Sequence, residues 1–270
     1  NKLYPHIFEM IGKEKFASGK PAEVLLQLKP ESARSDLSRP RLWAHDAPES
    51  TEIIRAFIKF ELTPPIEALE KRVLWYASRS QEFRGAYRFS NSLDLLSRHA
   101  PEKAEPFLEA AINHSEESVR ETGQEVRCRV AGIMPPFDKI YALYKNNPDV
   151  VYDEHQSVIA AISAINGQVG NGGFEQYLWN STANEWPNHR AALESIDAKD
   201  HLVILDRVLN LFGKEGPPLD RNSRHTPLAR VAKTQEKVLG ECDSQWYAIS
   251  ENLERLKIEY ALLHPESFRP

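Results

Sequence analysis

The residue types best suited to chemistry are concentrated in one short run in the second half of the chain. It reads Asn171-Gly172-Gly173-Phe174-Glu175-Gln176-Tyr177 and is followed by Asn180-Ser181. A glycine-rich turn at the start of a helix can bind phosphate through its backbone N–H groups. Here the preceding apolar residues have helical spacing, no Lys-Ser or Lys-Thr pair follows, and the flanking charged residues are acidic. We therefore expect a junction between two helices and no nucleotide site.

Helix geometry alone can also explain this run. Gly170 is expected to end one helix in a left-handed conformation, Asn171 to cap the next, and Glu175 to complement the dipole of that second helix. Phe174 and Tyr177 share one face of the second helix. This arrangement favours packing in the core, and an exposed aromatic patch for a partner is the alternative.

The remaining reactive residue types form no catalytic or metal-binding pattern. Cys128 and Cys242 are far apart in the sequence, and the nine histidines include no His-Glu-x-x-His pair. No Gly-x-Ser-x-Gly turn is present, and Asn and Gln side chains are poor acids, bases and nucleophiles. We therefore predict a protein without catalytic residues, metal or cofactor. An enzyme with its site at residues 171–180 is one alternative.

Negative charge is concentrated in the same part of the chain. Residues 1–134 contain 20 acidic and 20 basic side chains, whereas residues 135–270 contain 19 and 14, which accounts for the net charge of −5. Within residues 149–200, eight acidic residues accompany only Arg190 and Lys199. Such a surface repels nucleic acid and attracts a basic protein, and a solvated acidic face without function is the alternative. The residues predicted to contact a partner are Asp153, Glu154, Glu175, Glu185, Glu194 and Asp197.

The elements that must position these residues are predicted to be helices. Apolar residues recur at spacings of three and four along most of the chain, and strand patterns are scarce. Residues 20–50, rich in Pro, Ser and Arg, are expected to form a loop-rich segment. Met134-Pro135-Pro136 divides the chain into predicted domains of residues 1–134 and 135–270, because proline interrupts the preceding helix. Helices are expected near residues 64–78, 83–99, 103–113, 116–130, 137–146, 150–166, 172–180, 188–196, 200–212, 226–239 and 243–263.

The predicted fold is all-α, with HEAT-like helical pairs followed by a compact helical bundle. Residues 92–121 are similar to one HEAT repeat, because a polar turn at residues 113–117 separates two apolar helices and Val119-Arg120 opens the following helix. Stacked repeats of this kind bury a continuous core and present an extended surface to a partner. An irregular helical bundle is the alternative.

The motif Asn171-Gly172-Gly173-Phe174, with Gln176-Tyr177 and Asn180-Ser181 after it, also carries a family resemblance. Residues from about 137 to 268 resemble a bacterial family of helical domains whose best-described member is a DNA mimic. Gln168 stands where a Glu is expected, and Thr182-Ala183-Asn184 stands where a Gly is common. The resemblance implies an all-helical fold, a possible homodimer, and action by occupying the DNA-binding face of a partner protein.

These features lead to one main hypothesis. The protein is predicted to be a non-catalytic inhibitor whose acidic helical surface blocks a basic, nucleic-acid-binding protein such as a transcription regulator or a nuclease, without binding nucleic acid itself. An immunity protein that neutralises an antibacterial toxin is the runner-up. No apolar run reaches the roughly 20 residues needed to cross a bilayer, and the cysteine usage fits a reducing compartment. A cytoplasmic location without membrane contact is therefore expected.

Overall fold

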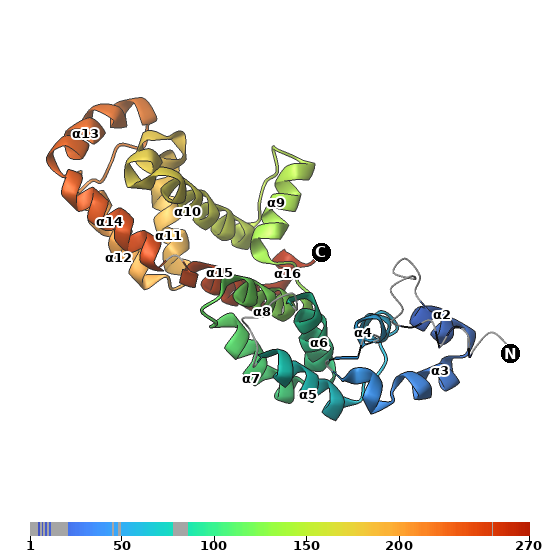
Figure 1. Cartoon of the computed structure of the whole chain (residues 1–270). Coiled ribbons are helices and arrows are strands. Elements are labelled where there is room, and N and C mark those ends of the chain that lie inside the picture. Colours follow the sequence, from blue (N-terminus) through green and yellow to red (C-terminus); the bar gives the residue numbers. More distant parts are fainter. Residues whose placement is uncertain are drawn as a thin grey trace. The chain divides into compact units, whose positions relative to one another are not determined.

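The structure, a computed structural model, is all-α as predicted, and its described residues contain no strand (Figure 1). Contacts divide the chain into two compact units, Asn1–Val130 and Ala131–Pro270. No helix in the described ranges combines the length and the apolar character needed to cross a membrane. The structure describes residues 5, 7, 9, 11, 21–44, 46–47, 50–77, 86–249 and 251–270.

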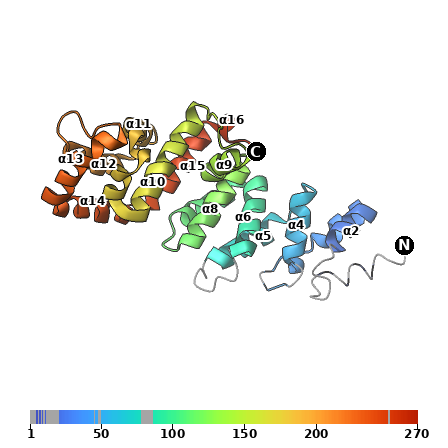
Figure 2. The same cartoon turned by 90° about the horizontal axis from the view of Figure 1, so that it is seen from above.

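The first unit is a succession of short helices, which Figure 2 shows following one another along the chain. Most of them bury one apolar face and expose the other, as the spacing of the apolar residues predicts. Its described elements are α2 (Pro21–Leu28), α3 (Pro30–Leu37), the 3-10 helix η2 (Pro40–Trp43), α4 (Ser50–Lys59), α5 (Ile66–Ala77), α6 (Ala86–His99), α7 (Pro101–Ile112) and α8 (Glu117–Val130).

The expectation of a loop-rich segment at residues 20–50 is wrong. Pro21, Pro30 and Pro40 each begin a helix. The first position of a helix tolerates proline because the missing N–H would have no partner within the helix. Leu25 and Leu37 are fully buried, so these short helices are held by packing against the rest of the unit.

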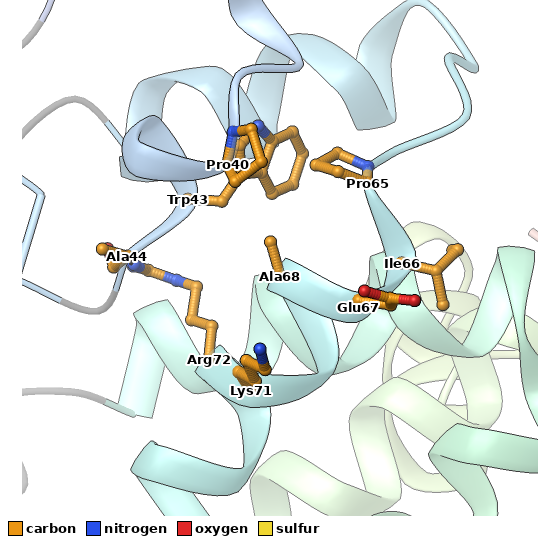
Figure 3. Close-up of a pocket in the computed structure, with 9 residues that line it drawn as sticks. All are labelled: Pro40, Trp43, Ala44, Pro65, Ile66, Glu67, Ala68, Lys71 and Arg72. Atoms are coloured by element: carbon orange, nitrogen blue, oxygen red, sulfur yellow. Dashed lines mark hydrogen bonds between the residues drawn. The ribbon is translucent and has the colours of Figure 1, made fainter.

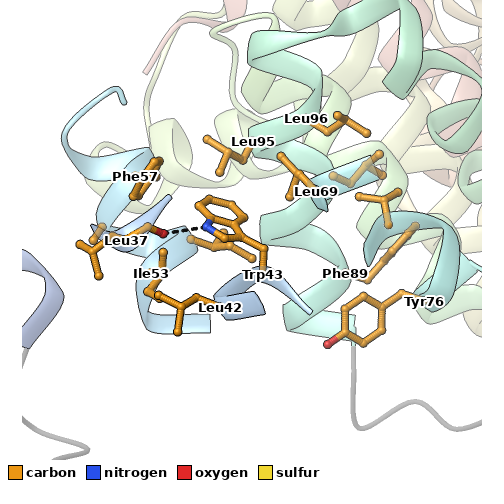
Figure 4. Close-up of a cluster of buried hydrophobic side chains, with 14 of the residues drawn as sticks. Leu37, Leu42, Trp43, Ile53, Phe57, Leu69, Tyr76, Phe89, Leu95 and Leu96 are labelled. Atoms are coloured by element: carbon orange, nitrogen blue, oxygen red, sulfur yellow. Dashed lines mark hydrogen bonds between the residues drawn. The ribbon is translucent and has the colours of Figure 1, made fainter. Parts of the chain in front are cut away.

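Trp43 lies in the core of the first unit (Figure 4). Its indole N–H donates to the Leu37 carbonyl oxygen at 2.8 Å, and its ring meets the edge of Phe57 with the ring centroids 5.0 Å apart. Leu69 of α5 and Leu96 of α6 belong to the same buried cluster. The tryptophan therefore lies in a core shared by η2, α4, α5 and α6.

Helices α6, α7 and α8 contact one another pairwise. A Cβ atom at Gly123 of α8 would lie 2.9 Å from the Cβ atom of Ala111 on α7, so glycine permits this close approach. The helices lie where the HEAT-like pattern of residues 92–121 places them. The similarity to a HEAT repeat itself stays a prediction.

The second unit is built around α10, which contacts α9, α11, α13, α14 and α16. Its buried side chains include Ile159, Ile162, Ile165 and Val169. The elements of this unit are α9 (Pro136–Asn146), α10 (Glu154–Trp179), the 3-10 helix η3 (Ser181–Glu185), α11 (Trp186–Ser195), α12 (Lys199–Asn210), α13 (Arg221–Thr234), α14 (Glu236–Ile249), α15 (Glu251–Leu263) and α16 (Pro265–Phe268).

The C-terminal segment of the second unit holds the start of α10 in place. The Gln156 side chain donates from Nε2 to the Ser267 carbonyl oxygen at 2.8 Å. The Met134 backbone N–H donates to the carbonyl oxygen of Phe268, also at 2.8 Å, and Phe268 is fully buried. The beginning of α10 is thus fixed by residues from both ends of its unit.

Candidate functional site

The Asn171–Tyr177 run forms a kink inside α10. The predicted helices near 150–166 and 172–180 are parts of this one element, in which Gly172 (φ −173°, ψ 29°) and Gly173 (φ 73°, ψ −174°) leave the helical conformation. The positive φ angle falls at Gly173 and not at Gly170, so the prediction for Gly170 is wrong. The conformation of Gly173 is one that only glycine adopts readily. The motif glycines therefore serve to redirect α10.

The helix after the kink is capped by a side chain from α14. Asp243 Oδ1 accepts a hydrogen bond from the backbone N–H of Phe174 at 2.7 Å. Burial raises the pKa of Asp243, and this hydrogen bond opposes the increase. Asn171, the predicted cap, lies before the kink, so that prediction is wrong. A Cβ atom at Gly173 would lie 2.4 Å from Asp243 Oδ2, which leaves no room for any other residue.

Two aromatic residues of the motif are core residues, as predicted. Phe174 and Tyr177 are fully buried, and the edge of the Phe174 ring meets Trp246 at 5.3 Å between centroids. The Tyr177 hydroxyl shares a hydrogen bond of 2.8 Å with His189 Nδ1. Trp179 differs, because it is 46% exposed. The alternative of an exposed aromatic patch is therefore wrong for Phe174 and Tyr177.

Arg224 of α13 binds the backbone at the end of α10, where Asn180 precedes Ser181. Its side chain is fully buried, and it donates from Nε to the Leu178 carbonyl oxygen at 2.6 Å and from Nη2 to the Asn180 carbonyl oxygen at 2.9 Å. Burial lowers the pKa of Arg224. The Asn180 amide in turn donates to Gln168 Oε1 at 2.7 Å. Further acceptors of Arg224 are the carbonyl oxygens of Ala183, Pro218 and Leu219 and the Asn184 side chain.

Motif residues thus acquire partners that the sequence analysis did not find. Asp243, Arg224 and His189 lie 69, 44 and 12 residues from the motif residues that they bind. No local spacing links these positions. Ser181 itself begins η3.

The acids predicted to contact a partner are all exposed, but they are spread over several elements. Asp153 caps the start of α10, where its side chain accepts from the backbone N–H of Gln156, and Glu154 follows it. Glu175 lies in the same element beyond the kink. The other three acids, Glu185, Glu194 and Asp197, flank or belong to α11.

The part of the chain that resembles known proteins includes the kink in α10, its cap Asp243 and the buried Arg224. Residues 152–264 match the family model described as DMP19-like protein. This DMP19-like segment contains Gly173, Asp243 and Arg224, and the match confirms the family resemblance over that range. Less than half of the chain is matched. No curated protein and no solved structure matched the chain.

Ion pairs separate the acids of residues 149–200 into paired and free carboxylates. Glu194 Oε2 lies 3.4 Å from Arg190 Nη1, and Asp197 Oδ2 lies 3.0 Å from Lys199 Nζ. Arg190 also binds Asp206, with Nε 2.7 Å from Oδ1. Both basic residues of this window are therefore engaged. The acids of the window that form no ion pair with another described residue, which we call the free acids, are Asp149, Asp153, Glu154, Glu175, Glu185 and Asp200.

The histidines of the DMP19-like segment do not come together in one site. His189 and His201 are buried, and burial lowers the pKa of each to about 4. His155 instead stacks on His264 at 3.7 Å between centroids and bonds the Tyr260 hydroxyl at 2.9 Å. Across the described residues, no group of three or more His, Cys, Asp or Glu side chains is arranged to hold a metal ion.

The first unit contains a pocket of about 560 Å³ between η2 and α5 (Figure 3). Pro40 and Pro65 line its walls. Arg72 in its floor donates from Nη1 to the Ala44 carbonyl oxygen at 2.7 Å and from Nη2 to the Tyr76 hydroxyl at 3.0 Å. These contacts tie η2 to α5, so the arginine has a structural role here.

Proposed function

We propose that this protein is a non-catalytic binding protein that blocks a basic, nucleic-acid-binding surface of a protein partner. The DMP19-like match supports a protein of the DNA-mimic type. The observation that supports the proposal is the set of free acids, which are exposed and form no ion pair with another residue that the structure describes. A basic partner can therefore approach these carboxylates without displacing a paired cation.

The free acids are most concentrated at the start of α10. Asp149, Asp153 and Glu154, which we call the α10 acids, lie within six residues. Duplex DNA carries one negative charge per about 1.7 Å of its axis, so this surface reproduces only a short part of a duplex. It suits a partner that reads a few phosphates through a small basic patch. Charge steering would make association fast and sensitive to salt.

Charge neutralisation at conserved geometry tests the proposal. The test variant is Asp149→Asn, Asp153→Asn and Glu154→Gln in the full chain, in which Asn keeps the capping role of position 153. The matched control is Glu194→Gln with Asp197→Asn, which alters carboxylates that are already paired. Asn also tolerates the positive φ of 58° at position 197.

The partner is the protein that co-purifies with the wild-type chain from the producing cell. Neutralising the α10 acids should slow association about tenfold at low salt and flatten its salt dependence, whereas the control should change the rate less than about twofold. Duplex DNA should compete with the chain for the partner. The proposal is wrong if the partner binds chain and duplex together, or if the test variant associates as fast as wild type.

The same experiment separates the immunity hypothesis from the proposal. An immunity protein would co-purify with a toxin, and the toxin would be neutralised without any requirement for competition with DNA. A toxin partner that ignores duplex DNA would favour the immunity function.

A further inference from the structure

Helix α9 exposes an aromatic face next to the α10 acids. Phe137, Tyr141 and Tyr144 are 50%, 55% and 53% exposed, and their spacing of four and three residues places them on one side of the helix. The rings of Phe137 and Tyr141 stack at 6.3 Å between centroids. Ile140, by contrast, is buried. The packing of α9 within its unit therefore leaves these three rings about half exposed.

This aromatic face is continuous with the acidic segment that follows it. Burial is the larger cause that raises the pKa of Tyr152, and the neighbouring Tyr144 adds to this increase. Asp149 lies between these two tyrosines in the sequence, and Asp153 directly follows Tyr152. Lys139 is directed to the C-terminus, where its Nζ donates to the Arg269 carbonyl oxygen. Lys145 remains as an exposed positive charge on α9.

Charge and area together select the occupant of this face. Aromatic side chains bury about 150–250 Å² each, so three half-exposed rings offer roughly 300 Å². A stable interface needs about 800 Å² on each partner, so the rings can form only the centre of a larger contact. The three α10 acids outnumber the exposed Lys145, so this surface would repel a second copy of itself and attract a basic partner.

The chain itself shows how a cation would meet these rings. Lys257 Nζ lies 5.9 Å from the centroid of Phe137. Aromatic rings attract ammonium and guanidinium groups placed over their faces, and tyrosine is enriched among residues that dominate interfaces. Tyr141 and Tyr144 have exposed rings of the same kind.

We propose that the aromatic face of Phe137, Tyr141 and Tyr144 forms the anchoring centre of the partner interface, where the Tyr141 and Tyr144 rings stack against arginine or lysine side chains held by the α10 acids. This inference rests on the proposed function and names the contact that fixes the basic partner. The face lies outside residues 152–264, so the DMP19-like match does not cover it.

The test uses the full chain and a fluorescently labelled deca-arginine peptide as probe, with deca-lysine as the second probe. Tyr141→Ala with Tyr144→Ala should weaken deca-arginine binding about fivefold or more without changing its salt dependence. Tyr141→Phe with Tyr144→Phe keeps the rings and should bind within about twofold of wild type. Val203→Ser, which alters another exposed apolar residue of the unit, should have no effect.

The outcomes distinguish the two proposals. Loss of binding in the α10-acid variant with full binding in the Tyr→Ala variant overturns the aromatic centre and leaves the acidic function standing. If only the Tyr→Ala variant loses peptide binding, and the α10-acid variant binds with the same salt dependence as wild type, the acidic function is overturned. Tetranitromethane labelling of the wild-type chain gives a readout that requires no substitution. The peptide should protect Tyr141 and Tyr144, and labelling that is unchanged by the peptide contradicts the inference.

Discussion

Replacing Gly173 with alanine should destabilise the second unit by about 3–5 kcal/mol. The backbone at this position has φ 73° and ψ −174°, which costs a non-glycine residue about 1–3 kcal/mol. The added Cβ atom would also lie 2.4 Å from Asp243 Oδ2. The carboxylate would have to move away from the Phe174 N–H, and a hydrogen bond to a charged group contributes about 1.5–3 kcal/mol.

Three neighbouring variants serve as controls for this prediction. Gly172 has an extended φ of −173°, and its Cβ would meet the flexible end of Gln176, so Gly172→Ala should cost less than about 1 kcal/mol. Gly170 is helical with nothing within 4 Å of an added Cβ, so Gly170→Ala should stabilise by about 0.5–1 kcal/mol. Gly173→Ala combined with Asp243→Ala removes the steric clash and should cost less than the sum of the two single variants.

Urea unfolding of the full chain measures these effects. Tryptophan fluorescence follows unfolding and includes a signal from Trp246, which contacts Phe174. Hydrogen exchange of the α10 amides shows whether the loss is local to this helix. The strain explanation is refuted if Gly173→Ala is as stable as Gly170→Ala. It is also refuted if Asp243→Ala leaves the cost of Gly173→Ala unchanged.

Three further predictions follow from the contacts of the second unit. Asp243→Asn should keep the cap and hold stability within about 1 kcal/mol, because burial disfavours the charged carboxylate, whereas Asp243→Ala should lose about 1.5–3 kcal/mol in urea titration. Burial lowers the pKa of His189 and of His201 to about 4. Protonation of these histidines therefore favours the unfolded chain. The free energy of unfolding should have its full value above pH 6.5 and decrease by up to about 3 kcal/mol for each histidine as the pH falls to 4. Thermal melts across this range should show a flatter profile for His201→Phe. Arg224→Met should lower stability by about 3 kcal/mol or more, because several buried carbonyl oxygens lose their donor, and Arg224→Lys should not restore it in the same melts, because one ammonium cannot span these acceptors.

The helical fold could be predicted because apolar spacing is a local property. The predicted helix at 200–212 and the observed α12 differ by one or two residues at each end, and the helix predicted at 137–146 coincides with α9 to within one residue. The prediction of a loop-rich segment at residues 20–50 failed for a physical reason. Their helices are eight residues long or shorter, too short for a clear period, and their prolines begin helices instead of breaking them.

The kink could be located in the sequence but not explained there. Two adjacent glycines mark the position, yet the conformation depends on Asp243, which lies 69 residues after Phe174. The sequence favours a local cap by Asn171, but in the fold this distant carboxylate supplies the acceptor. Charge behaves in the same way. The sum of charges over residues 149–200 is visible in the sequence, but the pairing of Arg190 with Asp206 beyond that window is not.

The kink in α10 determines how its acids lie relative to one another. Glu154 lies before the kink and Glu175 after it, so their separation depends on the backbone conformation at Gly172 and Gly173. A partner that spans both ends of α10 requires a fixed kink, because a change at Gly173 redirects Glu175 relative to Glu154. A partner that contacts only the α10 acids and the aromatic face of α9 does not. Binding by a folded kink variant therefore separates a long duplex-like contact from a short one anchored beside α9, and the crowding of charge at the start of α10 favours the short contact.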